Sequence, residues 1–232
     1  MSRFANAALL AGTSVLLVVA SVSSVLSETR TEDAATARGI VTEARTAVEE
    51  MKTSPQNEAF QDALADAKGV LIVPDFYKGG LIVGGATGEG VLLTREGNAD
   101  SWSDPAFYRL SSGSLGLQAG FKESELVLVV RSEQALDKFM EDKITLGAEG
   151  GIAVAKIGAG MGAASTSNVD ADVIAFTHSE GAFAGVSLEG SVLSTAEKLN
   201  HAYYGKPMTP NQILHGEMTV GSSVADGLRD AL

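Results

Sequence analysis

Cysteine is absent from the 232 residues, and histidine occurs only three times. The lack of cysteine excludes a disulfide scaffold, a Cys-ligated zinc or iron–sulfur site, a thiol nucleophile and a lipid anchor on an N-terminal cysteine. His178, His201 and His215 are far apart in the sequence, so their spacing does not predict a metal site. No Gly-x-Ser-x-Gly elbow occurs. The sequence therefore predicts no catalytic residue, no metal and no cofactor, and it favours a protein that is not an enzyme.

Basic residues are scarce as well, because 17 Lys and Arg stand against 29 Asp and Glu, a formal net charge of −12. Sequence-independent nucleic-acid binding requires a basic face, so no nucleic-acid partner is expected. A local basic patch on an anionic membrane stays open. With 45% hydrophobic and 20% charged residues, the chain is expected to fold rather than to remain disordered.

The long hydrophobic segment is confined to the N-terminus. Arg3 is the only charged residue before Glu28, residues 7–20 are mostly apolar, and several serines follow. This pattern is typical of a secretory signal peptide over residues 1–27, and the apolar run is shorter than the ~20 residues of a membrane span. An uncleaved anchor in the inner membrane is the alternative. Cleavage would leave 16 basic and 29 acidic residues, a formal charge of −13, on an exported protein of the periplasm or cell envelope.

Residues 28–52 are predicted to form an amphipathic helix with an alanine-rich apolar stripe. Arg38, Arg45 and Lys52 are spaced by seven and form one flank of this stripe, which we call the basic flank. Two interpretations remain open: a helix packed on its own domain with a solvated rim, or a helix that lies on lipid with its basic flank down. The opposite flank carries Glu32, Glu43 and Glu50.

The rest of the chain is predicted to be rich in strands. Ser54-Pro55 ends the first helix, and residues 57–68 predict a second one with Phe60 and Leu64 facing inward. From Gly69 onward, short apolar runs are punctuated by Gly, Asp or Ser, which is typical of a meandering sheet. Further helices are expected after Ser132 and over residues 195–203. The predicted strands cover residues 69–74, 81–83, 91–93, 126–130, 152–155, 173–176 and 183–186.

The predicted fold class is α+β: an N-terminal helix pair, then a glycine-rich, mainly antiparallel coiled or barrel-like sheet with edge helices. We expect one domain over residues 28–232, with a helical part (28–68), a sheet-rich core (69–194) and a C-terminal helix and tail (195–232). Two glycine tracts are predicted to be turns rather than nucleotide cradles. These are residues 84–90, interpreted as a tight hairpin turn, and residues 158–162, a turn or loop.

Aromatic residues are few, but Phe76 and Tyr77 precede Lys78 between two predicted strands. If these rings are exposed, they would settle at a membrane interface beside the lysine. If they are buried, they would belong to the hydrophobic core. Both interpretations stay open. The residues predicted to contact lipid are Arg38, Arg45, Lys52, Lys68 and Lys78 for the headgroups and Phe76 and Tyr77 as anchors.

Several segments in order resemble the SYLF domain, the lipid-binding domain of yeast-type actin-binding proteins. They include residues 67–75, 84–92, 116–120, 135–139, 167–176, 185–191 and 203–205. The resemblance covers residues 35–215 and implies binding of anionic phospholipids, including phosphoinositides in eukaryotes, and actin binding in members that carry an SH3 domain. The predicted signal peptide resembles bacterial members that act outside the cytoplasm, where actin binding is not expected.

These observations together predict a non-enzymatic, peripheral phospholipid-binding protein of the periplasm or cell envelope. The expected partner is an anionic phospholipid or membrane surface. The alternative is a structural or protein-interaction module that docks an envelope partner.

Overall fold

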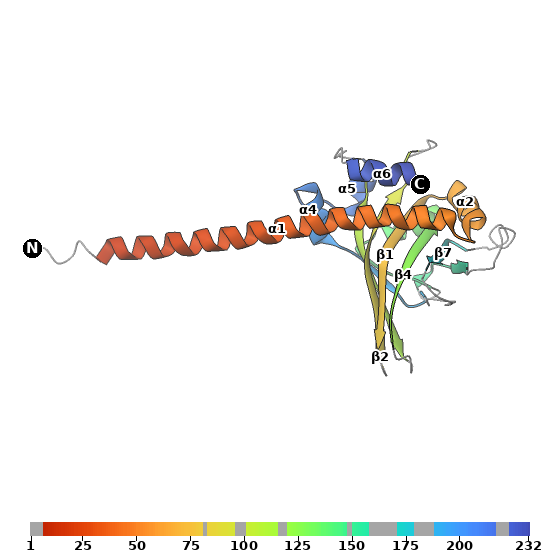
Figure 1. Cartoon of the computed structure of the whole chain (residues 1–232), viewed down its shortest axis with the longest axis horizontal. Coiled ribbons are helices and arrows are strands. Elements are labelled where there is room, and N and C mark those ends of the chain that lie inside the picture. The colour runs from red at the N-terminus through yellow and green to blue at the C-terminus, as the bar shows by residue number, and fades with distance from the viewer. Residues whose placement is uncertain are drawn as a thin grey trace, which may run out of the picture.

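The computed structural model describes residues 7–80, 83–95, 101–115, 120–147, 150–157, 171–178, 188–216 and 223–232. The predicted α+β architecture is confirmed, with N-terminal helices followed by a curled sheet (Figure 1). The helices are α1 (Ala7–Thr53), α2 (Asn57–Ala65), α3 (Glu133–Phe139), α4 (Glu197–Tyr204), α5 (Pro210–Leu214) and α6 (Ser223–Ala231). The strands are β1 (Gly69–Gly80), β2 (Val83–Thr94), β3 (Ala106–Leu115), β4 (Gly120–Val130), β5 (Lys143–Thr145), β6 (Val154–Ile157), β7 (Val173–His178) and β8 (Val192–Thr195).

The strands form one sheet in the order β5-β8-β3-β2-β1-β4-β7-β6. Neighbouring strands pair antiparallel except β6 and β7, which are parallel. The long β1 occupies the centre, between β2 and β4, and its first half is a run of buried aliphatic residues. A strand buried on both faces needs such a continuous run, which is why the segment after Gly69 is recognisable in the sequence.

Helix α1 packs its apolar stripe on the sheet, in agreement with the first of the two interpretations. Ala37, Val41, Ala44 and Val48 are fully buried, and the helix ends at Thr53, directly before Ser54-Pro55. The helix is longer than predicted, because it begins at Ala7 and continues through the apolar segment, so that its N-terminal half extends away from the body (Figure 1). Within the described residues, no helix combines the length and the apolarity needed to cross a membrane.

The core joins both layers through aromatic side chains. Phe60 of α2 is fully buried and meets Phe176 of β7 edge to face, with ring centroids 5.3 Å apart. Leu64 is buried on the same side of α2, so the predicted inward face of this helix is confirmed. On α3, the predicted cap is also present, since the Ser132 side chain accepts a hydrogen bond from the Ala135 backbone N–H.

Two predictions between residues 84 and 108 were wrong. The glycine tract 84–90 belongs to β2 instead of a hairpin turn, and β3, which begins at Ala106, has no counterpart among the predicted strands. The reason in β2 is close packing: a Cβ on Gly88 would lie 2.4 Å from the carbonyl oxygen of Asp75. In β3, Phe107 and Tyr108 are buried, and the backbone of this strand pairs with β2 on one side and with β8 on the other.

The C-terminal helices cover one end of β3. Asn200 of α4 is fully buried; its Nδ2 donates to the Phe107 carbonyl oxygen, and its Oδ1 accepts from the Phe107 N–H. Arg229 of α6 forms an ion pair with the buried Asp104. The helix predicted over 195–203 is therefore confirmed as α4, whereas α6 was not predicted.

Candidate functional site

A bulge in β1 shapes one hollow of the described surface. The register shifts between Ile72 and Tyr77 toward β2, and between Val73 and Phe76 toward β4. Pro74 lies inside this interval and has no N–H to donate to a ladder, which is the usual setting for proline within a sheet. The chain of β1 therefore leaves the regular pleat just where α1 crosses above it.

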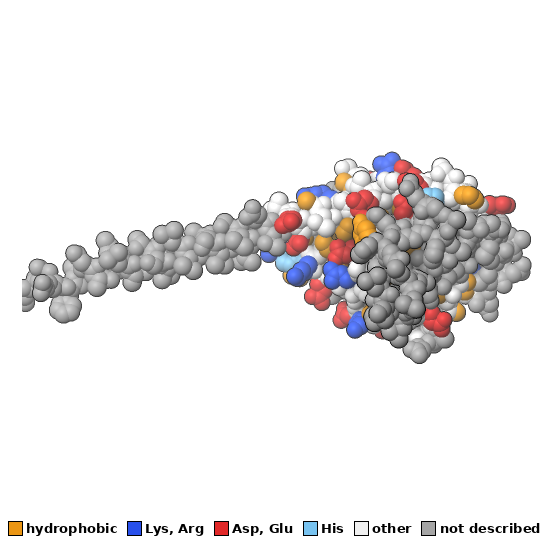
Figure 2. All heavy atoms as spheres, turned by 60° about the horizontal axis from the view of Figure 1, so that its bottom comes forward, with side chains coloured by type: hydrophobic (Ala, Val, Ile, Leu, Met, Phe, Trp, Pro, Cys, Tyr) orange, Lys and Arg blue, Asp and Glu red, His pale blue; other side chains and the backbone are white. Residues whose placement is uncertain are grey.

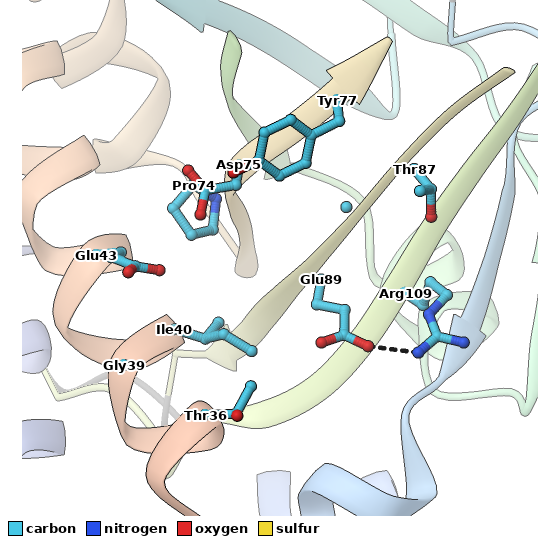
Figure 3. A pocket seen from close by; sticks show the side chains of 11 residues that line it. Thr36, Gly39, Ile40, Glu43, Pro74, Asp75, Tyr77, Thr87, Glu89 and Arg109 are labelled. Carbon is cyan, nitrogen blue, oxygen red and sulfur yellow. Dashed lines mark hydrogen bonds and ion pairs between the residues drawn. The ribbon is translucent and has the colours of Figure 1, made fainter. Parts of the chain in front are cut away.

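A groove of about 600 Å³ lies between the bulge and α1 (Figure 3). Thr36, Ile40 and Glu43 project into it from α1, as Figure 3 shows. The sheet contributes Pro74, Asp75 and Tyr77 from β1, Thr87, Gly88 and Glu89 from β2 and Arg109 from β3.

The groove is acidic. It carries the carboxylates of Glu43, Asp75 and Glu89 against a single guanidinium, that of Arg109, which forms an ion pair with Glu89. Tyr77 adds an apolar wall, and at 53% it is the one large hydrophobic residue recorded as exposed in the described ranges. An acidic, partly aromatic groove suits a cationic group better than an anionic headgroup, because opposite charges attract at short range.

Next to the groove, three ligand-type side chains converge from three elements. Glu125 of β4 and His178 of β7 occupy directly opposite register positions, and Glu50 comes from the last part of α1. One atom from each lies within 4.8 Å of the others, and His178 Nε2 is 3.9 Å from Glu50 Oε2. Glu50 lies seven residues after Glu43 and thus on the same flank of α1. Groove and cluster together form one acidic surface.

This environment raises the pKa of Glu125 to about 7. Partial burial is the largest cause, followed by the negative charge of Glu50, a hydrogen bond between the two carboxyl groups and the charge of Asp75. All of these disfavour the ionised form of Glu125. Sequence analysis missed this group, because the residues lie on three elements that are far apart in the chain.

The basic flank has the helical geometry predicted for it, but its charges are not equivalent. Arg38 is exposed, and neither Arg38 nor Lys52 ion-pairs with another described residue. Arg45 pairs with Glu49, with Nε and Oε1 2.8 Å apart. The guanidinium of Arg45 also lies against α6, because a Cβ on Gly227 would be 3.1 Å from its Nη1. The flank therefore borders α6, and one of its three charges is partly neutralised.

The other predicted contacts separate in space. Lys68 is exposed at the start of β1 and pairs with Glu133, 3.1 Å away. Phe76 is 1% exposed and belongs to the core, so its interpretation as a membrane anchor was wrong, while Tyr77 is exposed. The segment from Phe76 to Lys78 is not a turn either, since β1 continues to Gly80. Residues 158–162 lie outside the described residues.

Lys78 lies in a part of the sheet that we call the distal sheet end: residues 77–80, 83–87, 111–115 and 120–123. Among the residues that the structure describes, only β3, β2, β1 and β4 continue here, because the described part of β8 pairs with β3 no further than Ser111 and that of β7 pairs with β4 no further than Glu125. In Figure 1 these strands extend beyond the body. Lys78 of β1 and Lys122 of β4 are directly opposite partners in this region. Opposite positions of an antiparallel pair share a face of the sheet.

The family model described as "Ysc84: Las17-binding protein actin regulator" matches residues 111–232. This chain belongs to the Ysc84 family. The predicted SYLF membership is thereby confirmed. The family is described by binding and actin regulation rather than as a family of enzymes.

Three of the similar proteins come from yeast, cattle and humans. Protein YSC84 of Saccharomyces cerevisiae is 34% identical over 161 residues, which cover 68% of this chain and 34% of the yeast protein. SH3 domain-containing YSC84-like protein 1 is 29% identical over 164 residues in Bos taurus, covering 70% of this chain and 48% of that protein. The human protein of the same name is 30% identical over 155 residues, covering 66% and 45%. This chain thus matches between a third and a half of the length of these relatives.

Proposed function

We propose that this chain is a non-enzymatic, peripheral phospholipid-binding protein of the periplasm or cell envelope, which contacts anionic membrane through its distal sheet end. The observation that supports the proposal is the direct opposition of Lys78 and Lys122 where the sheet narrows to four strands. Two cations at opposite positions share one face, which concentrates positive charge on a chain whose net charge is negative.

The magnitude of this attraction is modest and local. Each surface cation near an anionic bilayer contributes on the order of 1 kcal/mol, so two lysines retain the chain only if apolar contacts assist. The exposed Tyr77 precedes Lys78 and lies on the other face of the same end of the sheet, since successive strand residues alternate, and aromatic rings of this type settle at the membrane interface. The sequence that joins β1 to β2, Leu81-Ile82, is apolar as well. Glu123, opposite Tyr77, is the nearest acidic residue in the register and reduces the local charge.

A broad basic surface is not the basis of the proposal. Figure 2 looks toward the lower side of the molecule in Figure 1, and on the described surface visible there acidic and basic side chains alternate. The basic flank of α1 is the rival membrane contact. Its Arg38 and Lys52 carry charges that no described acidic residue pairs with, but it borders α6 rather than standing clear of the domain.

Flotation of the purified chain with vesicles tests the proposal. We expect retention on phosphatidylglycerol/phosphatidylcholine vesicles, little retention on phosphatidylcholine alone, and a decrease with added NaCl because salt screens exposed charges. The double variant Lys78→Glu/Lys122→Glu should lose most of the retention. Lys143→Glu/Lys198→Glu changes the charge equally at two exposed sites on β5 and α4 and is the matched control.

Two results would contradict the proposal: no flotation of the parent chain with anionic vesicles, or full retention of Lys78→Glu/Lys122→Glu. A loss confined to Arg38→Glu/Arg45→Glu/Lys52→Glu would assign the membrane contact to the basic flank instead. The stability of each variant is checked by thermal unfolding.

A second candidate function is that of a protein-interaction module that docks an envelope partner. The acidic groove beside Tyr77 favours it, because its shape and charge suit a basic segment. A photoreactive residue in place of Thr87, which lines the groove, distinguishes the two functions. Crosslinks to one protein rather than to lipid would favour docking. Actin regulation, named for the family model, is less favoured for an exported chain.

A further inference from the structure

The cluster of Glu50, Glu125 and His178 has the arrangement of a small metal site. Two of its members, Glu125 and His178, are fixed opposite each other on neighbouring strands and share a face of the sheet. Glu50 comes from α1, which packs over that face, and His178 Nε2 lies 3.9 Å from its Oε2. The backbone therefore sets the positions of all three side chains before any ligand binds.

One oxygen atom of this cluster lacks the partner that such a group normally has. Glu125 Oε2 is shielded from solvent and accepts no hydrogen bond from any described residue. No Lys or Arg of the described residues ion-pairs with Glu50 or Glu125. A buried acceptor without a donor is energetically unfavourable, and a cation at this position would remove that cost.

The junction next to His178 is held firmly and contains a second unpaired acceptor. Gln56, 4% exposed, donates from Nε2 to the carbonyl oxygen of Thr177, 3.2 Å away. Its Oε1 is buried and has no donor among the described residues. This bond ties the segment after α1 to β7 one residue before His178, so Glu50 and His178 are constrained to remain close.

We propose that Glu50, Glu125 and His178 bind one divalent transition-metal ion of the zinc type, which clamps α1 to strands β4 and β7. The donor set decides the class of metal. One imidazole nitrogen and two carboxylates with an open position suit Zn²⁺, whereas Ca²⁺ and Mg²⁺ favour sets of oxygen ligands. Zinc bonds of about 2.0–2.1 Å bring ligand atoms to about 3.3 Å from each other. Since the ligand atoms here lie within 4.8 Å, rotation of the side chains is enough to close the site.

Calorimetric titration of the full-length chain with ZnCl₂ at neutral pH tests this proposal, with CaCl₂ and MgCl₂ in parallel. We expect one saturable zinc site per chain and no comparable binding of calcium or magnesium. Glu50→Gln and His178→Gln should each weaken zinc binding by roughly 100-fold or more, because loss of even an outer-sphere partner costs 10–100-fold. The matched controls, Glu49→Gln on the same helix and His215→Gln at the end of α5, should bind as the parent does.

A measurement on the unaltered chain avoids dependence on the folding of the variants. Co²⁺ should produce visible ligand-field absorption that stoichiometric Zn²⁺ abolishes, and Zn²⁺ should raise the thermal unfolding temperature. The proposal is overturned if the parent chain shows no saturable zinc binding, or if folded Glu50→Gln and His178→Gln bind zinc like the parent. None of these measurements depends on vesicle binding. Failure of the metal proposal would therefore leave the proposed membrane function untouched.

Discussion

Replacing Glu125 by Gln should stabilise the protein at alkaline pH, although the residue is half-buried and contacts its neighbours. The pKa of Glu125 is raised to about 7, first by burial and then by Glu50 and Asp75. Its folded state therefore holds a proton more tightly than the unfolded chain does. Below pH ~4.5 both states are protonated and the group costs nothing. As the pH rises toward 7, the unfolded state ionises first, so the free energy of unfolding falls.

The size of the effect follows from the shift. A rise from 4.5 to about 7, at about 1.4 kcal/mol per pKa unit, corresponds to at most about 3.5 kcal/mol. Glu125 is only half-buried, and solvent screening reduces the expected gain for Glu125→Gln at pH 8 to about 1–2 kcal/mol. For a chain of this length, 1 kcal/mol shifts the thermal midpoint by about 2–4 °C.

Thermal and urea unfolding of parent and Glu125→Gln, with a chelator to remove divalent ions, measures this gain. The titratable groups around Glu125 are Glu50 of α1, Asp75 of β1 and His178 of β7. As a control, the same comparison is made with Glu49→Gln, whose carboxylate is exposed and paired with Arg45. We expect Glu125→Gln to be more stable than the parent at pH 8 and to lose that advantage at pH 4.5, with no such dependence for Glu49→Gln. A variant less stable than the parent at pH 8 would refute the reasoning.

Three further substitutions and one control, Gly113→Ala, test the packing. Gly90→Ala should destabilise the chain by several kcal/mol, because its Cβ would lie 2.2 Å from a β1 carbonyl oxygen. Gly113→Ala should be close to neutral, because nothing lies within 4 Å of the added Cβ. Both variants are measured by urea unfolding. Asn200→Ala removes both hydrogen bonds to the Phe107 backbone and should cost about 1–3 kcal/mol in the same assay. Phe60→Ala should cost about 3–5 kcal/mol and lower the thermal midpoint, because it leaves a cavity beside its aromatic partner on β7.

Much of the fold was predictable because its signals are local. The buried stripe of α1, its end before Pro55, the inward face of α2 and the Ser132 cap depend on residues a few positions apart. The extent of the strands was not predictable in the same way. Glycines usually mark turns, but Gly88 and Gly90 lie within β2 because the bulged β1 approaches too closely for a side chain. This close approach of β1 to β2 depends on the tertiary structure, and no local sequence pattern indicates it.

The site was predicted less well, for the same reason. The seven-residue spacing drew attention to the basic flank, while the opposite flank of α1, with Glu43 and Glu50, is the one that lines the groove and meets β4 and β7. His178 lies far from Glu50 and Glu125 in the sequence, and only the antiparallel register brings Glu125 beside it. The acidic flank was visible as a pattern, but its partners were not.

The central claim, that the distal sheet end contacts anionic membrane, is tested most directly by single-cysteine labelling. Because the chain has no cysteine of its own, each label is unique. An environment-sensitive fluorophore is placed on Gly113→Cys, an open position within the distal sheet end, on Thr42→Cys between Arg38 and Arg45 of the basic flank, and on His215→Cys at the end of α5. With phosphatidylglycerol-containing vesicles, we expect a blue shift and increased emission for the Gly113→Cys label alone. An unchanged Gly113→Cys label together with a shifted label on Thr42→Cys or His215→Cys would contradict the claim.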